Sequence, residues 1–101
     1  MEKSRRAGHR HARLSHLLSE ALEAVVRDEL SDPSIEEVSL TAIDLSPDGH
    51  HVFVHFVAPD PASAAEALSR ASPFVRTCIA DRLGLDRVPH VHFEKDPRCL
   101  E

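Results

Sequence analysis

The segment ALSRASPFVRTCIADRLG, residues 67–84, places a proline in the middle of a stretch with helical spacing. A proline inside a helix removes one backbone hydrogen bond and clashes with the preceding turn, at a cost of about 3 kcal/mol. A second helix that begins here resolves the conflict, because Ser72 suits an N-cap and Pro73 suits the first helical position. The residue before a proline is also disfavoured in the helical conformation. The segment therefore predicts two helices that meet at a sharp bend, over residues 62–71 and 73–83.

The strongest periodic signal is an apolar stripe near the start of the chain. Its members recur at positions i, i+3, i+4 and i+7, which places them on one face of a helix. Pro33 prevents this helix from continuing, so we expect an amphipathic helix over residues 10–30. The stripe consists of Leu14, Leu17, Leu18, Ala21, Leu22, Val25, Val26 and Leu30.

Three segments alternate in the manner of strands, at residues 38–45, 51–57 and 89–95. In the first, the alternation changes phase near Thr41. A one-residue slip would turn the following side chains to the wrong face, so we expect a β-bulge there. The sequence SPDG at 46–49 has strong turn chemistry. The second segment is apolar on both faces, which indicates a central strand or a strand with one face covered by a partner.

The length of 101 residues and the 42% hydrophobic content suit one domain with a modest core. We expect a single α+β domain over residues 1–101, with flexible tails at about 1–8 and 97–101. Its order is α-β-β-α-α-β, with a three-stranded sheet and helices packed on one face. No apolar run reaches the roughly 20 residues that span a bilayer. Two lone cysteines without an export signal favour a reducing compartment, so we expect a cytoplasmic protein with no membrane partner.

Charge is distributed unevenly along this chain of formal net charge −5. Residues 1–16 carry five cations and one acid, a net of +4. Residues 17–69 carry one cation and eleven acids, a net of −10, and residues 70–101 carry six cations and five acids, a net of +1. Electrostatic steering of a charged partner depends on the local field and not on the net charge of the whole chain. The pattern therefore describes a basic N-terminal segment attached to an acidic body. A solvated tail is the alternative interpretation of the basic run.

The eight histidines invite a metal interpretation. His90 and His92 would share one side of a strand, and His51 or His55 on a neighbouring strand would bring three imidazoles together, as in a zinc site. No cysteine stands at ligand spacing beside them, so exposed histidines on a sheet face are the preferred interpretation. We therefore expect no metal and no cofactor.

Known catalytic motifs are missing from the sequence, which has no nucleophile elbow, no Gly-rich phosphate loop and no HExxH. A hydrolytic or nuclease role would depend on Asp44, Asp48 and His50 near one turn, and Asp48 with Gly49 is better explained by the turn itself. A protein-interaction module is the third class, compatible with the acidic middle and with outward Phe53 and Val57. Five cations in the first sixteen residues argue against that class. We expect a protein without catalytic activity.

The predicted order, with a tight bend between the last two helices, is the topology of the type II KH fold. Three segments carry a more specific match. They are the first helix with its basic entry, RAGHRHARLSHLLSEALEAVVRDELSDP, and the segment DPSIEEVSLTAIDLSPDGHHVFVHF. The third is ALSRASPFVRTCIADRLGLDRVPHVHFEKD, with the bent helices, the Leu-x-x-Val-Pro linker and the last strand. Through these segments nearly the whole chain, about residues 5–101, resembles the ribosome-binding factor A family.

This resemblance implies a non-enzymatic cold-shock and assembly factor. Such a factor binds the immature small ribosomal subunit and assists late folding or processing of 16S rRNA. KH domains place a Gly-x-x-Gly loop between two helices, where the backbone approaches a phosphate, and this family has a bend of the form Ala-x-Gly instead. The matching positions here are Ala71, Ser72 and Pro73, so the glycine is replaced by a residue that has no N–H to donate.

We expect electrostatic, shape-based RNA contact, because the chain has four Phe and no Tyr or Trp for base stacking. Arginine suits phosphate because its planar guanidinium presents a fork of donors. The expected partners are the small ribosomal subunit and its 16S rRNA, with the chain acting as a monomer. The predicted RNA-binding residues are Arg5, Arg6, Arg10 and Arg13 at the first helix and its lead-in, and Arg70, Ser72, Arg76, Arg82 and Arg87 as a second group.

Overall fold

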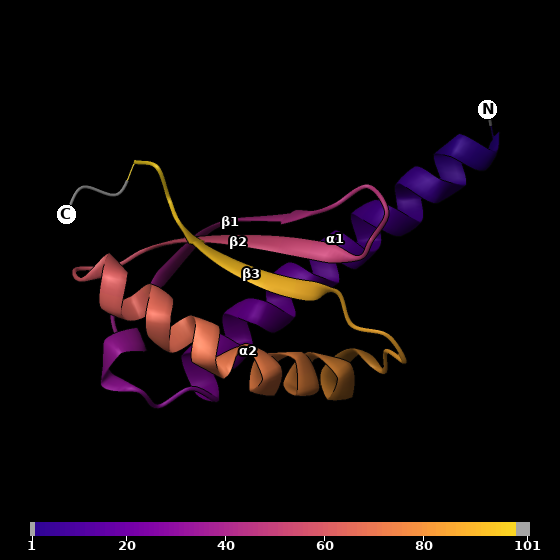
Figure 1. Cartoon of the computed structure of the whole chain (residues 1–101). Coiled ribbons are helices and arrows are strands. Elements are labelled where there is room, and N and C mark those ends of the chain that lie inside the picture. Colours follow the sequence, from indigo (N-terminus) through magenta and orange to yellow (C-terminus); the bar gives the residue numbers. More distant parts are fainter. Residues whose placement is uncertain (1, 99–101) are drawn as a thin grey trace.

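A three-stranded sheet in the order β1–β2–β3 forms the centre of the computed structural model, which describes the backbone of residues 2–98 and the side chains of residues 10–98. The central strand β2 pairs antiparallel with β1 and parallel with β3. Helices α1 and α2 pack on one face of the sheet (Figure 1), which confirms the predicted α+β, KH-like fold. The elements are α1 (Glu2–Asp28), the 3-10 turn η1 (Pro33–Ile35), β1 (Ser39–Leu45), β2 (His51–Val57), α2 (Pro61–Leu83) and β3 (His90–Lys95).

Helix α1 is longer at its start than the predicted helix over 10–30. It begins at Glu2 and ends at Asp28, so it includes the backbone of a segment assigned to a tail from the sequence. Most of its apolar stripe enters the core as predicted, with Leu18, Leu22 and Val25 fully buried, but Leu17 is exposed. The basic N-terminal half of the helix projects past the end of the sheet (Figure 1).

The turn and the bulge lie where the sequence predicts them. Gly49 adopts a φ of +76° and donates its N–H to the Ser46 carbonyl at 2.9 Å. The Ser46 hydroxyl donates to the Asp48 carboxylate at 2.6 Å, so this acid serves the turn. The pairing register of β1 shifts between Leu40 and Ala42, which confirms the predicted bulge.

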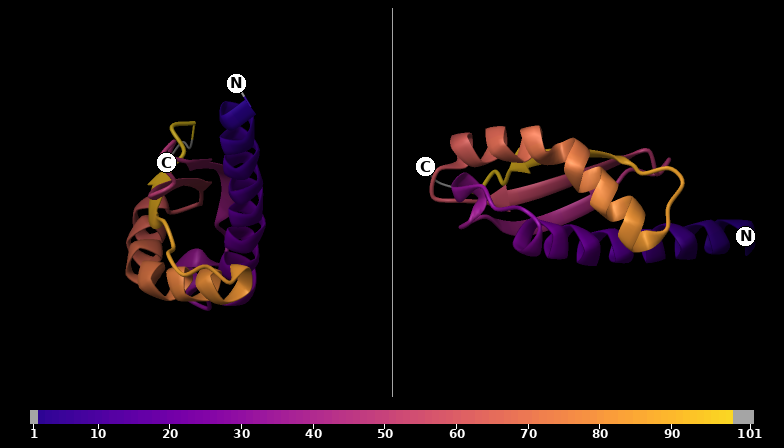
Figure 2. Two further views of the ribbon diagram at one scale, coloured as in Figure 1. Left: turned by 90° about the vertical axis from the view of Figure 1, so that its right-hand side faces the viewer. Right: turned by 90° about the horizontal axis from the view of Figure 1, so that it is seen from below.

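Helix α2 corrects the prediction of two separate helices. It is one helix that continues through Pro73 and bends sharply there (Figure 2). Ser72 is therefore not an N-cap, because it lies inside the helix and its hydroxyl donates to the Val91 carbonyl of β3 at 3.4 Å. The Thr77 hydroxyl donates to the Pro73 carbonyl at 3.1 Å, a back-bond of the kind that bends helices. Proline thus kinks the helix without ending it.

Both ends of α2 are capped. The Asp60 carboxylate accepts from the Ser63 N–H at 3.3 Å, and Pro61 occupies the first helical position. At the other end Gly84 has a φ of +63°, the left-handed conformation that glycine adopts without a steric penalty.

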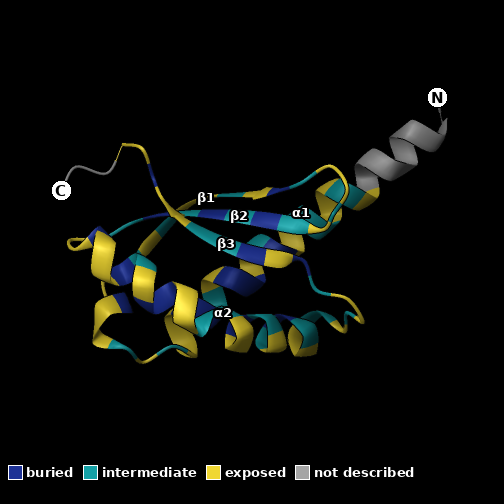
Figure 3. Ribbon diagram, viewed as in Figure 1, coloured by how far each residue is buried: buried dark blue, intermediate teal, exposed yellow. Residues whose placement is uncertain are grey.

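The core lies between the sheet and the two helices (Figure 3). One cluster joins α1 to the sheet and to the second half of α2, and the other lies under the first half of α2 around Phe56. Over the residues that the structure describes, neither helix is long and apolar enough to cross a membrane. The largest fully buried side chains are Phe56, Leu18, Leu22, Leu68, Ile79, Val25, Val52, Val54 and Val75.

Asp96, directly after β3, is the buried charged side chain of the described part of the protein. Its carboxylate accepts from the Thr41 hydroxyl of β1 at 2.6 Å, from the Arg98 backbone N–H at 2.8 Å and from the Arg98 guanidinium at 3.1 Å. These hydrogen bonds hold the pKa of Asp96 well below its ordinary value, and those from the Arg98 side chain have the largest effect. Because β1 and β3 flank β2, the carboxylate ties the two outer strands together.

Asp96→Asn is expected to lower the melting temperature at pH 7 and to have a smaller effect in acid. A carboxyl group whose pKa is lower in the folded protein than in the unfolded chain stabilises the fold. This stabilisation is fully present above the unfolded pKa of about 3.9 and is lost progressively as the pH falls from there towards the folded pKa. Thermal melts at pH 7 and at about pH 3 measure the difference between the two proteins. Asp81→Asn, at an exposed site on α2, is the control. A difference between wild type and Asp96→Asn that stays constant across this range would contradict the assigned role.

Candidate nucleic-acid interface

Three segments meet at one end of the molecule: the N-terminal half of α1, the β1–β2 turn and the loop before β3 (Figure 1). The His11 Nε2 atom lies 2.9 Å from the Ser46 carbonyl oxygen, which joins α1 to the turn. The His90 N–H donates to the His50 carbonyl at 2.9 Å, which joins the turn to the loop. We call this continuous surface the basic end, and it comprises residues 10–16, 46–50 and 84–90.

A hollow of about 570 Å³ opens on the basic end, between the second half of α2 and the start of β3. A second hollow of about 480 Å³ continues along β3 as far as Glu94. Both are lined by Pro73, Arg76 and His90, so together they form a groove between the kinked helix and the edge strand of the sheet. The exposed Arg87 lies on the wall of the first hollow.

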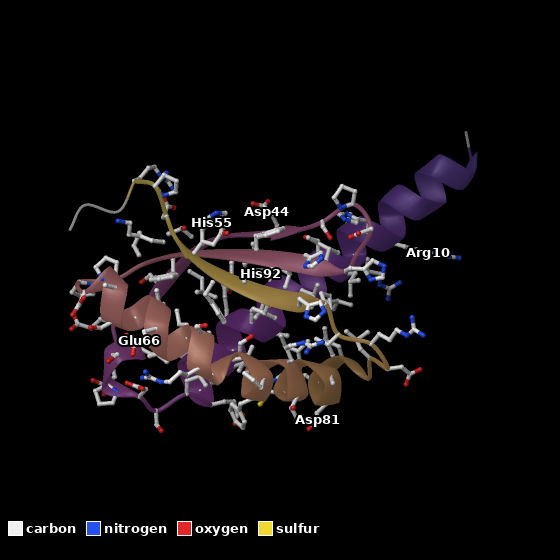
Figure 4. The ribbon with its side chains drawn as sticks, in the orientation of Figure 1. Arg10, Asp44, His55, Glu66, Asp81 and His92 are labelled. Atoms are coloured by element: carbon white, nitrogen blue, oxygen red, sulfur yellow. The ribbon has the colours of Figure 1, made fainter. Side chains whose placement is uncertain are left out.

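Three of the predicted RNA-binding arginines are exposed and carry no acidic partner within the described part of the chain: Arg10, Arg13 and Arg87. Arg10 points away from the body of the protein (Figure 4). All three belong to the basic end, where their guanidinium groups are available to phosphate. The side chains of Arg5 and Arg6 lie outside the described residues.

Two predicted arginines lie outside the basic end. Acids of the body neutralise their charges. The Arg70 guanidinium donates to Glu66 at 2.8 Å and lies 3.9 Å from Asp32. The Arg82 guanidinium donates to Glu29 at 3.3 Å, a contact between α2 and the residue that follows α1. Because their charges are already paired with carboxylates, these two arginines attract a phosphate less strongly.

Two further predicted residues, Arg76 and Ser72, hold the groove together. Arg76 donates to the Val88 carbonyl at 3.0 Å and to the Pro89 carbonyl at 3.3 Å, which fixes the loop before β3 against α2. Ser72 donates to β3 itself at Val91. Both side chains line the groove and shape it, and Arg76 adds a positive charge to its wall.

The histidines that the sequence predicts on a sheet face lie on the face that the helices leave uncovered, and Phe53 joins them in one group of rings, which was not foreseen from the sequence. Phe53 and His92 are stacked with centroids 5.0 Å apart and planes at 18°. The His51 ring lies 5.2 Å from His92 and 5.5 Å from His90, and its Nδ1 is 3.0 Å from the His92 Nε2, a hydrogen bond between imidazoles. We call His51, Phe53, His90 and His92 the ring cluster. It arises from the register of β2 against β3, in which His51 pairs with His90 and Phe53 with His92.

The zinc alternative does not match the positions of the described side chains. Within residues 10–98, no three His, Cys, Asp or Glu side chains are grouped so as to hold a metal ion. His51 and His92 are hydrogen-bonded to each other. His55 faces acids, with its Nε2 3.3 Å from Glu94 and its Nδ1 4.0 Å from Asp44.

The sheet with both helices on one face, and the kinked helix beside an edge strand, define a KH-like protein. The model of the family described as Ribosome-binding factor A matches residues 10–100. Ribosome-binding factor A of Thermomicrobium roseum is 38% identical over 97 aligned residues, which cover 92% of this chain and 74% of that protein. This chain belongs to the ribosome-binding factor A family.

Solved structures lead to the same family. The crystal structure of ribosome-binding factor A from Thermus thermophilus matches with a TM-score of 0.68 and 30% identity, over 87% of this chain and 92% of that one. A homology model of the Thermus thermophilus factor, fitted into the cryo-EM map of a 30S complex, matches with a TM-score of 0.62 and 31% identity. This second match covers 86% of this chain and 91% of the fitted one.

Proposed function

We propose that this protein is a non-enzymatic assembly factor that binds the immature small ribosomal subunit and assists late maturation of 16S rRNA. The observation that carries the proposal is the 31% identity and shared fold with a factor fitted into a 30S complex. The protein acts by binding, as a monomer in the cytoplasm, and no step requires a catalytic residue or a cofactor.

The charge distribution supports RNA contact through the basic end. Arg10, Arg13 and Arg87 are exposed there without acidic partners among the described residues. The segment 17–69 carries a net charge of −10 and is repelled by phosphate. One attractive end on a repulsive body favours a single docking orientation, in which the N-terminal half of α1 meets the rRNA.

Sedimentation with purified immature and mature small subunits, at several salt concentrations, tests the proposal. We expect the protein to sediment preferentially with immature subunits and to be released as salt rises, because each neutralised phosphate frees condensed counterions. If four arginines of α1 contact phosphate, a plot of the logarithm of the binding constant against the logarithm of the salt concentration has a slope of about −3, at roughly −0.7 to −0.9 for each contact. Equal sedimentation with both kinds of subunit, or none at low salt, would contradict the proposal.

A further inference from the structure

We propose that the ring cluster is a second RNA-contact surface, on which one or two unpaired nucleobases stack. This inference rests on the proposed function for the identity of its partner. Apart from His90, which the two surfaces share, its residues lie outside the basic end, and the force differs, since the basic end attracts phosphates and the ring cluster binds bases.

The geometry of the cluster supplies the stacking surface. Phe53 and His92 lie within 18° of parallel, and His51 lies within 29° of His90, so rings from two strands form one row. His90 is exposed and the other three are half-buried. Both helices lie on the opposite face of the sheet (Figure 2), so nothing in the described part of the chain covers the row. Bases stack on such rings without regard to sequence, because every base has a π-face.

The chemistry of the rings favours a nucleobase over an apolar protein surface. Three of the four rings are imidazoles, whose nitrogens donate or accept hydrogen bonds. An apolar partner would bury these nitrogens without satisfying them, which costs free energy. A base offers a π-face together with an edge of donors and acceptors, as single-stranded RNA does when its bases are splayed out.

Charge sets the direction from which RNA reaches the rings. His90 belongs to both the ring cluster and the hollow that Arg87 lines, so the cluster is continuous with the basic end. Farther along β3 lies the carboxylate of Glu94, 3.3 Å from His55. Asp44 of β1, which pairs with Phe53, lies 4.0 Å from His55 (Figure 4). These acids repel a phosphate backbone. The strand of RNA therefore enters past Arg87, places its bases on the rings and turns away before Glu94.

Binding of a short oligouridylate, compared with an abasic ribose–phosphate chain of the same length, tests the inference. We expect Phe53→Leu to weaken oligouridylate binding at least about 5-fold, the lower range for loss of one stacked base. Its salt slope should match that of wild type, because no phosphate contact is removed. The abasic chain should bind both proteins equally. Phe74→Leu, at a phenylalanine on α2 that is 48% exposed, is the matched control and should bind like wild type.

NMR of the wild-type protein provides a test that does not depend on a variant. The ring resonances of Phe53 and His92 should shift when oligouridylate is added and stay in place with the abasic chain. Unshifted rings, or wild-type affinity of Phe53→Leu for oligouridylate, would overturn the inference. A Phe53→Leu protein that loses subunit binding yet keeps oligouridylate binding would assign the face to a protein partner, and that too would overturn it. Base-dependent oligouridylate binding without subunit binding would instead refute the proposed function alone.

Discussion

Leu18→Ala is expected to lower the free energy of unfolding by about 2–5 kcal/mol, the range for truncating a buried leucine. Leu18 is fully buried where α1 packs on the sheet, in a cluster with Val52 and Val54. A domain of this size has only about 5–15 kcal/mol in total, so the variant is expected to be close to unfolding. Urea denaturation followed by circular dichroism measures the loss.

The neighbouring Leu17 provides the control, because it carries the same side chain one residue away on the same helix. It is 37% exposed, whereas Leu18 has no exposed surface. Leu17→Ala should therefore cost less than about 1 kcal/mol, as substitutions near the surface do. Similar losses at both positions would contradict the orientation of α1.

Replacing Arg10 and Arg13 together by alanine should weaken subunit binding and reduce the salt slope by about 1.5, the contribution of two phosphate contacts. Both residues are exposed at the basic end, and neither has an acidic partner in the described residues. Stability should scarcely change, because isolated surface charges contribute only about 0–1 kcal/mol. Sedimentation with small subunits over a salt series measures the slope.

Arg27→Ala is the internal control for this double variant. Arg27 lies on the same helix but donates to Asp28 at 3.0 Å and belongs to the acidic part of the chain. Its loss should leave the salt slope unchanged. Equal damage from Arg27→Ala, or wild-type binding by the double variant, would remove the basic end from the interface.

Local signals were sufficient to predict most of the fold. The apolar stripe of α1, apart from Leu17, and the phase change at the bulge depend on neighbouring residues only, and the structure confirms them. The prediction that one helix ends before Pro73 and another begins there was wrong, because α2 continues through this residue. Leu68 before the kink and Val75 and Ile79 after it are all fully buried. Continuing the helix keeps both halves packed, and this tertiary packing outweighs the local preference for a new N-cap.

The candidate site depended on contacts that no local pattern reveals. The sequence identifies arginines, but pairing of Arg82 with Glu29 joins residues 53 positions apart. The ring cluster likewise requires the parallel register of β2 and β3. The count of four Phe and no Tyr or Trp led to an expectation of scarce stacking surfaces. Histidines placed beside Phe53 by that register supply the missing rings.

The mixed pairing of the sheet also sets an order of assembly during folding. β1 and β2 are joined by a turn of a few residues, so they come together at a small entropic cost. β3 pairs with β2 only after the whole of α2 has crossed over, and such non-local pairing is slow. The ring cluster takes residues from both β2 and β3, so it exists only once this last step is complete. A partly folded chain therefore carries the charges of α1 before it has any surface for stacking a base.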